Sequence, residues 1–329
     1  MINEFKKGVS VILCCYNSSG RITATLTHLA QQVVPDDFSW EVILIDNAST
    51  DNTAETALSI WDKLQHNHVD LRIVNESMPG QVFARKKGVS ESKYDCIVFC
   101  DDDNWFDKNY VYTAYCRMES DPSIGVAGGQ NFPVSDVDTY PLWFEEHKDK
   151  YATGIPAERS GDVSHRGFIL GAGMVTRKSL FIKLNDEKYP SLLNGRNGEK
   201  LSTGDDFEYC KRALLRSYKL YYDEGLKLQH FIPAQRLTDA YLDRLMQGID
   251  EAGKVLDEYD LAIHIKKRFV NKNKLRLVLL SPIRILVTVL GLGKKRNAHD
   301  EKLTLYYLNP FATSPNTTRE QIKKFIFCE

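Results

Sequence analysis

Three consecutive aspartates, Asp101, Asp102 and Asp103, directly follow an apolar run at residues 97–100. Such a run is typical of a buried strand in a parallel sheet, and open α/β sheets bind ligands beyond the carboxyl ends of these strands. Asp101 and Asp103 are two residues apart, so either carboxylate could reach one cation at the strand exit. Oxygen ligands of this kind suit Mn²⁺ or Mg²⁺ better than zinc. An acidic turn before a helix near Lys108 is the alternative interpretation.

A second acidic pair, Asp205 and Asp206, stands before apolar residues at helical spacing. The helix dipole favours anions at this position, which suits a general base but equally suits a helix N-cap. A positioned carboxylate that removes a proton from an attacking hydroxyl accelerates transfer by about 10²- to 10⁴-fold. The apolar segment 168–175 contains Gly171 and Gly173, where backbone could approach a ligand closely, although glycine there could also simply relieve packing.

Alternating strand and helix signals surround the first aspartate cluster and predict βαβ units with a mostly parallel sheet. We expect strands at residues 9–15, 40–45, 71–74 and 97–100, and helices at residues 22–32, 53–65 and 83–92. Further along, we expect helices at residues 110–118, 177–184 and 238–259 and one starting near residue 205, with strands at 124–129, 219–222 and 226–230. Residues 135–166 lack periodicity and are rich in aromatic side chains, as in a binding loop or lid.

The dinucleotide fingerprint G-x-G-x-x-G is missing after the first strand. A G-x-G does occur at residues 171–173, but it lacks the third glycine and comes too late in the chain. No G-x-x-x-x-G-K-[ST] occurs either. A dehydrogenase and a P-loop NTPase are therefore both disfavoured.

Charge is unevenly distributed, although the 329 residues carry a net charge of only -1 and give no reason to expect a nucleic-acid partner. Between residues 261 and 299 there is no acidic residue. Ten positive charges lie there, at Lys266, Lys267, Arg268, Lys272, Lys274, Arg276, Arg284, Lys294, Lys295 and Arg296. Together with the apolar stretch 275–292 they favour a segment at 262–297 that lies on an anionic membrane surface, with a core helix hairpin or a transmembrane span as the alternatives.

Seven cysteines, an odd number without a C-x-x-C pair, favour a reduced, cytoplasmic protein. Residues 1–8 are polar and lead straight into a strand, so we expect no signal peptide. The combined expectation is a cytoplasmic protein that is peripheral on the inner face of the cell membrane.

Five motifs occur together in the order and spacing of glycosyltransferase family 2, which the chain resembles over residues 8–235. They are residues 9–17 (VSVILCCYN), 45–51 (IDNASTD), 84–88 (ARKKG), 101–103 (DDD) and 204–206 (GDD). The resemblance implies a GT-A fold, a Rossmann-like and mostly parallel α/β sheet, at residues 1–235. Its nucleotide-binding half would be residues 1–130 and its acceptor and catalytic-base half residues 131–235. Residues 236–329 would form a helical carboxyl-terminal extension.

On the donor side, the resemblance implies roles for several residues near the first two strands and the first aspartate cluster. They are Cys15, Tyr16, Asn17, Asp46, Asn47, Arg85, Asp101 and Asp102, with Tyr16, Asp46 and Asn47 bordering the nucleobase and Arg85 facing the nucleotide. An exposed helix charge is the alternative for Arg85, and a turn-forming role is the alternative for Tyr16 and Asn47.

For the metal and the acceptor, the resemblance implies that Asp101 and Asp103 bind the cation, with Asp103 the more direct ligand. His230 stands where some members of the family contact metal or diphosphate, and a hydrogen-bonded histidine at a strand end is its alternative. Asp206 corresponds to the general base. The acceptor or sugar vicinity would include Asp205, Trp105, Gly171, Ala172 and Gly173, with a core or wall role as the alternative for Trp105.

Two departures from the family pattern matter. Residues 46–49 read Asp-Asn-Ala-Ser where the family often has Asp-Asp-Gly-Ser, which affects the expected base contact. The first acid of the family's Glu-Asp pair is the shorter Asp205, which leaves the expected base itself in place.

These observations predict a metal-dependent, inverting glycosyltransferase that uses Mn²⁺ or Mg²⁺. The expected donor is a nucleoside-diphosphate sugar, with UDP favoured over GDP or dTDP, and the acceptor is a saccharide or a polyprenyl-linked molecule in surface polysaccharide assembly. A nucleotidyltransferase that makes a nucleotide sugar, and an inactive sugar- or lipid-binding partner, are the alternatives. The turn at residues 16–21 is a poor version of the basic, glycine-rich loop of the former.

Overall fold

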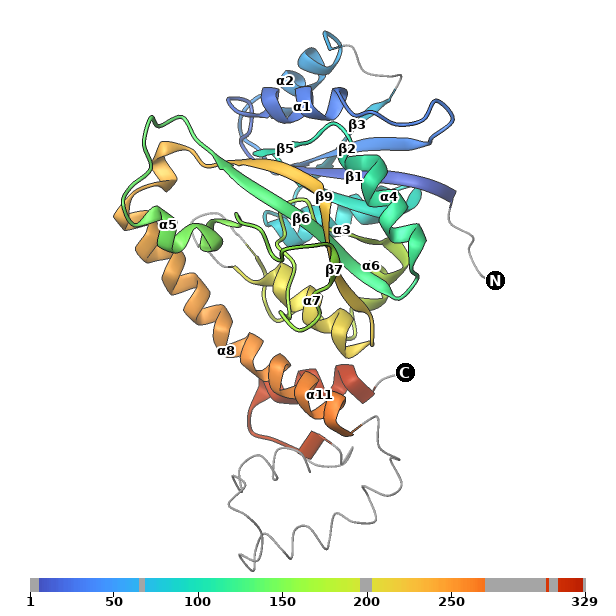
Figure 1. The fold of residues 1–329 in the computed structure, drawn as a ribbon, viewed down its shortest axis with the longest axis vertical. Coiled ribbons are helices and arrows are strands. Elements are labelled where there is room, and N and C mark those ends of the chain that lie inside the picture. Colours follow the sequence, from blue (N-terminus) through green and yellow to red (C-terminus); the bar gives the residue numbers. More distant parts are fainter. Residues whose placement is uncertain (1–5, 65–68, 196–202, 270–305, 308–312, 328–329) are drawn as a thin grey trace, which may run out of the picture.

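The structure is a computed structural model that describes residues 6–64, 69–195, 203–269, 306–307 and 313–327. Within these ranges a nine-stranded sheet forms the centre, with the strand order β3-β2-β1-β4-β8-β6-β9-β5 and β7 beside β9. Figure 1 shows this sheet with helices around it and the carboxyl-terminal helices extending away from it.

The first half of the sheet is parallel, as predicted. It consists of β1 (Lys6–Cys15), β2 (Trp40–Asn47), β3 (Leu71–Glu76) and β4 (Tyr94–Asp101). The connecting helices are α1 (Ile22–Ala30), α2 (Thr53–Trp61) and α3 (Gln81–Glu91), so the helix expected at 53–65 ends earlier. Alternate residues of β1 face opposite layers: Val11 and Leu13 pack with α1 and α4, whereas Ile12 packs with α3.

The second half of the sheet is mixed. β6 (Ile124–Val134) runs parallel to β9 (Lys219–Phe231), whereas β8 (Val175–Arg177), β5 (Asn104–Phe106) and β7 (Gly161–Asp162) pair antiparallel with their neighbours. The two strands expected at 219–222 and 226–230 are one continuous strand, β9. β5 was not expected, because three residues after the aspartates give no strand signal of their own.

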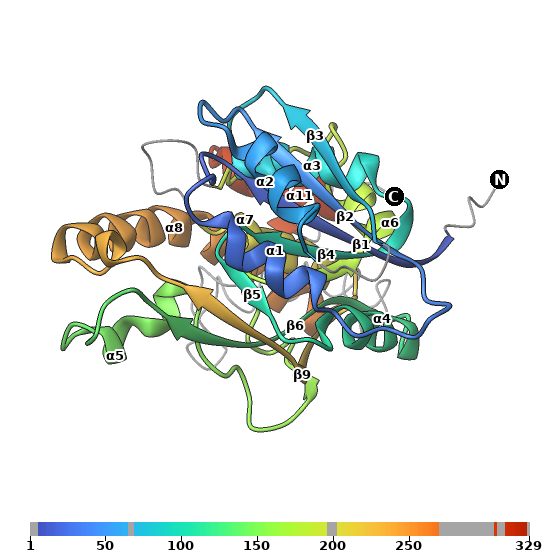
Figure 2. The same ribbon diagram turned by 90° about the horizontal axis from the view of Figure 1, so that it is seen from above.

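Helices cover both faces of the sheet. α4 (Tyr110–Ser120) joins α1 and α2 on one face, and α6 (Lys178–Leu184) and α7 (Asp205–Leu215) join α3 on the other. Residues 135–166 contain only α5 (Phe144–His147), the 3₁₀ turn η1 (Lys148–Tyr151) and β7. Figure 2 shows α5 at the same end of the molecule as the beginning of α8 (Asp239–Phe269).

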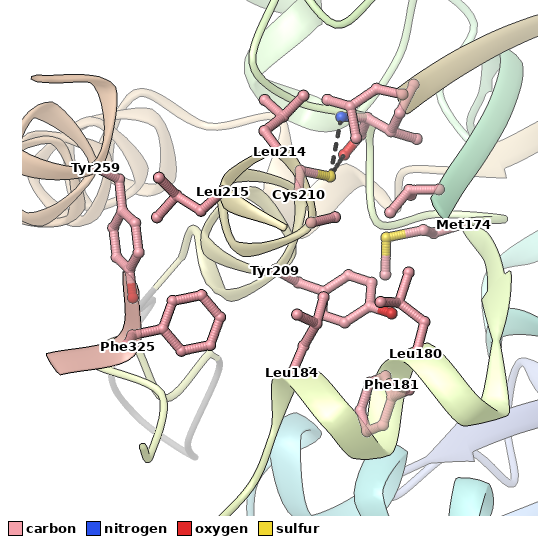
Figure 3. Packing of buried hydrophobic residues seen from close by; sticks show 14 of the residues in the cluster. Met174, Leu180, Phe181, Leu184, Tyr209, Cys210, Leu214, Leu215, Tyr259 and Phe325 are labelled. Carbon is pink, nitrogen blue, oxygen red and sulfur yellow. Dashed lines mark hydrogen bonds between the residues drawn. The ribbon is translucent and has the colours of Figure 1, made fainter. Parts of the chain in front are cut away.

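The carboxyl-terminal helices pack against α7. Figure 3 shows Tyr259 of α8 and Phe325 of α11 (Thr317–Phe327) beside Leu215, while Tyr209 on the opposite side of α7 lies against Phe181. Buried polar contacts join the same elements, because Tyr259 donates a hydrogen bond to Glu208 at 2.8 Å. α7 is therefore held between the sheet and the helical extension.

The helical extension differs from the expectation in two respects. α8 continues ten residues beyond the expected end at residue 259, to Phe269. It therefore includes the beginning of the expected membrane segment 262–297, and there Ala262, Ile263 and Ile265 are buried in the protein core rather than facing outward. Residues 270–297 of that segment lie outside the described residues. Among the helices that the structure describes, none has both the length and the apolarity to cross a membrane.

Candidate active site

The carboxyl ends of three neighbouring strands bring the predicted donor-side residues to one edge of the sheet. In the strand register, Cys14 of β1 lies opposite Asp101 of β4, and Cys15 lies opposite Asp46 of β2. Tyr16 follows at this edge and is 48% exposed. The side chain of Cys15 is buried in the apolar core, so only its backbone lies at the edge.

The loops beyond these strands hold one another by side-chain hydrogen bonds. Asn47 donates to the carbonyl oxygen of Met78 at 2.6 Å and accepts from the N–H of Gly80 at 2.8 Å, so its amide fixes the loop between β3 and α3. Asn17 accepts the N–H of Thr50 at 2.8 Å, which joins the loops after β1 and β2. Both asparagines thus have structural partners at the edge where a nucleobase is expected.

Ala48 has a φ of 57°, in the left-handed region that favours glycine. The family often has glycine at this position, and alanine adopts this conformation only at a cost in backbone strain. Next to it, the Oδ1 atom of Asp46 is buried and accepts no hydrogen bond from the described residues. A carboxylate oxygen in this state can accept an N–H from a ligand.

Asp101 and Asp102 have different surroundings. Gln81 at the start of α3 donates to Asp101 at 3.0 Å, and Asp101 remains partly exposed. Asp102 is buried, accepts a hydrogen bond from the Ser18 hydroxyl and pairs with Arg21 at 2.7 Å. Burial and the charge of Asp103 raise the pKa of Asp102, and Arg21 opposes this shift. The carboxylate of Asp102 therefore fastens the end of β4 to the turn before α1.

Asp103 is buried and surrounded by cationic and amide groups. Its Oδ2 accepts a hydrogen bond from Nη1 of Arg236 at 2.9 Å, and its Oδ1 accepts one from the Asn104 amide at 3.0 Å. The Nε2 atom of His230 lies 3.5 Å from Oδ1. The pairing of β5 with β9 places His230 opposite Asn104, and Phe231 donates its N–H to the Asp103 carbonyl at 2.9 Å.

Trp105 forms a wall behind this cluster. Its ring stacks on Phe231 with the ring centroids 5.4 Å apart, and on His28 with the centroids 5.9 Å apart. This arrangement agrees with the wall interpretation of Trp105. The aromatic stack supports the β5–β9 pairing that positions Asp103 and His230.

The side chains at this end of β4 include the kinds of ligand that divalent cations bind. Asp101 and Asp103 offer hard oxygen ligands, His230 adds an imidazole that Mn²⁺ accepts, and Asp103 already attracts the positive charge of Arg236. The described residues include no group of three or more His, Cys, Asp or Glu side chains arranged to hold a metal ion. Mg²⁺ is commonly bound by one or two carboxylates together with substrate phosphates.

The second acidic pair lies at the start of α7 and faces Arg85 of α3. Nη1 of Arg85 lies 3.1 Å from Oδ2 of Asp205, and both side chains are largely buried. Arg85 also lies over the Phe99 ring, 5.2 Å from its centroid. The alternative of an exposed helix charge is therefore wrong for Arg85. Burial opposes its charge, but Asp205 and then Asp101 raise the pKa of Arg85, which places it within the field of both acidic groups.

Asp206 is the candidate base, and its carboxylate accepts the N–H of Phe207 at 2.9 Å. Burial, followed by the charge of Asp205, raises the pKa of Asp206 to about 7, while Arg85 opposes the shift. A cavity of about 20 Å³, lined in part by Asp205, Asp206 and Arg85, has room for one water molecule. The pair therefore lies at a small internal space beside a positive charge.

Gly171 gives this carboxylate its room. A Cβ atom at Gly171 would lie 2.6 Å from Oδ2 of Asp206, closer than real Cβ contacts allow. Gly173 has a φ of 72° and packs against Tyr110, and Ala172 between them is buried. Gly171 thus leaves room for the Asp206 carboxylate and Gly173 for Tyr110, which agrees with the packing alternative, while the close approach to a ligand stays a prediction.

Several residues of the site were missed by sequence reasoning. Arg21, Arg236 and Gln81 pair with the three aspartates but belong to no motif. Arg236 is separated from Asp103 by 133 residues, so only the pairing of β9 with β5 brings it near. A basic residue shortly after His230 was the only available signal.

The sequence model of glycosyl transferase family 2 matches residues 10–184, more than half of the chain. The chain belongs to this family. It is 28% identical over 123 residues to a poly-beta-1,6-N-acetyl-D-glucosamine synthase of Staphylococcus aureus, a match that covers 37% of this chain and 28% of that relative. It is also 28% identical over 123 residues to a cholesterol galactosyltransferase of Borreliella burgdorferi, covering 37% of this chain and 32% of the relative. The chain thus matches less than half the length of these two relatives.

The crystal structure of S. aureus TarS 1-349 resembles this family 2 member in fold. The TM-score is 0.51 at 18% identity, and the likeness covers 79% of this chain and 80% of that one. The sheet flanked by helices is therefore a GT-A fold, as the sequence predicted, with a helical carboxyl-terminal extension.

Proposed function

We propose that this protein is a metal-dependent, inverting glycosyltransferase that moves a sugar from a nucleoside-diphosphate donor to a hydroxyl of a saccharide or lipid-linked acceptor. The observation that carries the proposal is the difference between the two acidic groups of the site. Asp103 is compensated by Arg236, as suits a group that attracts cations, whereas Asp206 has a raised pKa and, among the described residues, no ion-pair partner of its own. Family membership supports the same assignment.

Asp206 takes the role of general base in this proposal. Its carboxylate removes the proton of the acceptor hydroxyl as the oxygen forms a bond to the anomeric carbon, and the bond from that carbon to the diphosphate oxygen breaks. A pKa near neutrality suits a base that must accept a proton at physiological pH. Asp205 and Arg85 hold the helix start and set the charge around Asp206.

Asp101, Asp103 and His230 would hold Mn²⁺ or Mg²⁺ jointly with the donor diphosphate. The cation would supply Lewis-acid stabilisation of the negative charge that develops on the leaving diphosphate. Arg85 contributes a fixed positive charge from the base side of the site.

The carboxylate of Asp46, with one buried oxygen, favours a nucleotide sugar whose nucleobase carries a ring N–H on its pairing edge. Its buried, unpartnered Oδ1 can only accept a hydrogen bond when the carboxylate is ionised. Uracil, thymine and guanine present a ring N–H on this edge, whereas the ring nitrogen of cytosine is an acceptor and only its exocyclic amino group donates. UDP-sugars are the favoured donors, with GDP- and dTDP-sugars as alternatives, and the names of the relatives suggest testing N-acetylglucosamine and galactose first.

We further propose a cytoplasmic protein on an anionic membrane surface, in surface polysaccharide assembly. The acid-free stretch 261–299 with its ten basic residues supports this placement. Co-sedimentation with vesicles that contain phosphatidylglycerol, but not with phosphatidylcholine vesicles, is the expected result. Equal binding to both vesicles would contradict it.

Thermal stability with a panel of nucleotide sugars tests the donor assignment. UDP-, GDP-, dTDP- and CMP-sugars are compared with and without Mn²⁺, for the natural protein and for Asp103→Ala. A ligand at about 100 times its dissociation constant should stabilise the protein by about 2.7 kcal/mol. We expect a shift that needs Mn²⁺, occurs with one nucleotide other than CMP, and is lost in Asp103→Ala. No shift with any donor would reject the proposal.

A further inference from the structure

Arg236 pairs with Asp103, the acid that must bind the cation in the proposed function. Its Nη1 lies 2.9 Å from Oδ2 of Asp103, and Asp103 itself is buried. Asp103 and then Tyr241 raise the pKa of Arg236, against the effect of burial, so the guanidinium stays charged. Burying a carboxylate without a counter-charge is costly, which explains why this structure places a positive group on Asp103.

The backbone around Arg236 is fixed, whereas its side chain retains some solvent access. Tyr151 donates a hydrogen bond to the Arg236 carbonyl at 3.0 Å, and Arg236 closes the 3₁₀ turn η2 (Ala234–Arg236) that follows β9. The side chain is 22% exposed. A rotation of this side chain would therefore release Asp103 without moving β9 or His230.

Charge balance gives the two arginines at the aspartate cluster different roles. Arg21 pairs with Asp102, whose carboxylate also fastens the turn at Ser18, so this pair is part of the framework. Arg236 pairs with Asp103, beside His230. A divalent cation on Asp103 would repel the guanidinium, and a donor diphosphate would offer it a new anionic partner.

We propose that Arg236 couples metal binding to nucleotide binding: it pairs with Asp103 in the free protein and transfers to the donor diphosphate when a divalent cation binds Asp103. The inference rests on the proposed function, because it requires a diphosphate ligand. Arg236 weakens the binding of the cation alone, since the cation must displace it. It strengthens binding of cation and nucleotide together, and this coupling is reciprocal for the two ligands.

Mn²⁺ binding to Arg236→Gln tests the proposal without any measurement of activity. Binding of Mn²⁺ alone and Mn²⁺ with UDP is measured by calorimetry, with the association of Mn²⁺ and UDP in solution subtracted. A charged hydrogen bond contributes enough that Mn²⁺ alone should bind about tenfold more tightly to Arg236→Gln than to the natural protein. The factor by which UDP increases Mn²⁺ affinity should fall by about tenfold or more.

Two further variants separate this coupling from a structural effect. Arg236→Lys keeps the charge and should retain the weak binding of Mn²⁺ alone. Arg244→Gln removes an exposed arginine from the neighbouring α8 and should leave all Mn²⁺ constants unchanged. A merely structural role for Arg236 would not tighten Mn²⁺ binding when the side chain is removed.

The outcomes are distinguishable from failure of the proposed function. Unchanged or weaker binding of Mn²⁺ alone to Arg236→Gln overturns the inference, while UDP binding in the same samples still reports on the proposed function. Absence of Mn²⁺ binding by every variant also overturns it and removes metal dependence from the proposal. Absence of UDP binding by every variant overturns both.

Discussion

The two acidic groups of the site contain the same side chain but differ in how its charge is compensated. At the end of β4, Asp102 pairs with Arg21 and Asp103 with Arg236, while Asp101 accepts a hydrogen bond from Gln81. At the start of α7, Asp205 and Asp206 share one cation among the described residues, Arg85. The first arrangement places a positive charge on Asp102 and another on Asp103, although burial and the charge of Asp103 still raise the pKa of Asp102. The second leaves Asp206 without an ion pair of its own among the described residues and raises its pKa to about 7, which suits a proton acceptor.

The counter-charges show how a fold assigns roles to similar residues. Arg85 is 120 residues from Asp205, and Arg236 is 133 residues from Asp103. Each arginine reaches its acid through sheet topology or helix packing rather than through local sequence. The chemistry of a carboxylate in this protein is therefore decided by what the distant chain brings to it.

Removing the base should give the largest effect. Asp206→Asn should lower the transfer rate by about 10²- to 10⁴-fold, because the acceptor hydroxyl loses its proton acceptor. Stability at pH 8 should be unchanged or higher, since a buried charge is removed. Turnover of the UDP-sugar and urea unfolding measure the two effects, with the exposed Asp250→Asn on α8 as the matched control. A loss of activity explained by unfolding would remove the distinction between the two groups.

Removing the shared cation should give the largest loss of stability. Arg85→Met leaves Asp205 and Asp206 buried beside each other, and breaking a buried pair in this way costs about 3–5 kcal/mol. Urea unfolding measures the loss. The neighbouring Lys86→Met, which is less buried on the same helix, is the control. The double variant Arg85→Met with Asp205→Asn should recover part of the loss, and failure to recover any would argue against the pairing of Arg85 with Asp205.

The sequence predicted the parallel half of the fold because its signals are local. Apolar runs that end in polar turns located β1, β2, β3 and β4, and the parallel order then placed Asp46 and Asp101 at one edge. The mixed half was less predictable, since β5 is three residues long and has no periodicity to detect. The candidate acids were found because they occur in motifs, whereas Arg21 and Arg236 were not.

There is a physical reason why the surroundings of each acid could not be predicted from the sequence. Burial of Arg85 depends on its contacts with the distant Asp205 and Phe99, and its exposed alternative was equally consistent with a helix that carries Arg85, Lys86 and Lys87. Likewise, the extent of α8 was underestimated because its last turns are buried by contacts with distant elements rather than by a stronger local pattern. Such properties arise only from tertiary contacts.

The pH dependence of transfer should reveal the like-charge pair at α7. Because Asp206 must be deprotonated, kcat/KM should rise with pH through an apparent pKa of about 7. Asp205→Asn removes a neighbouring negative charge, so the positive charge of Arg85 acts mainly on Asp206. The pKa of Asp206 should therefore fall by about one unit. A pH–rate profile measures the shift. An unchanged profile in Asp205→Asn would mean that Asp205 does not influence the base.

The same shift makes stability depend on pH. The pKa of Asp206 is raised above its ordinary value of 3.8, so its favourable contribution is complete below that value and is lost as the pH rises towards about 7. The unfolding free energy should fall over this interval. The fall should be smaller in Asp205→Asn, where the pKa of Asp206 lies lower.

Removing one arginine at the compensated cluster should have the smallest effect. Arg21→Gln leaves Asp102 with the Ser18 hydroxyl as a partner, and the Arg21 side chain is 36% exposed, so solvent already screens the pair. The expected loss is about 1 kcal/mol in urea unfolding, decreasing at high salt. The exposed Arg159→Gln is the control and should change stability less. Arg85→Met removes the one arginine that both Asp205 and Asp206 face among the described residues. A loss in Arg21→Gln as large as that in Arg85→Met would therefore show that both acidic groups are compensated alike, and the division of roles between them would have to be abandoned.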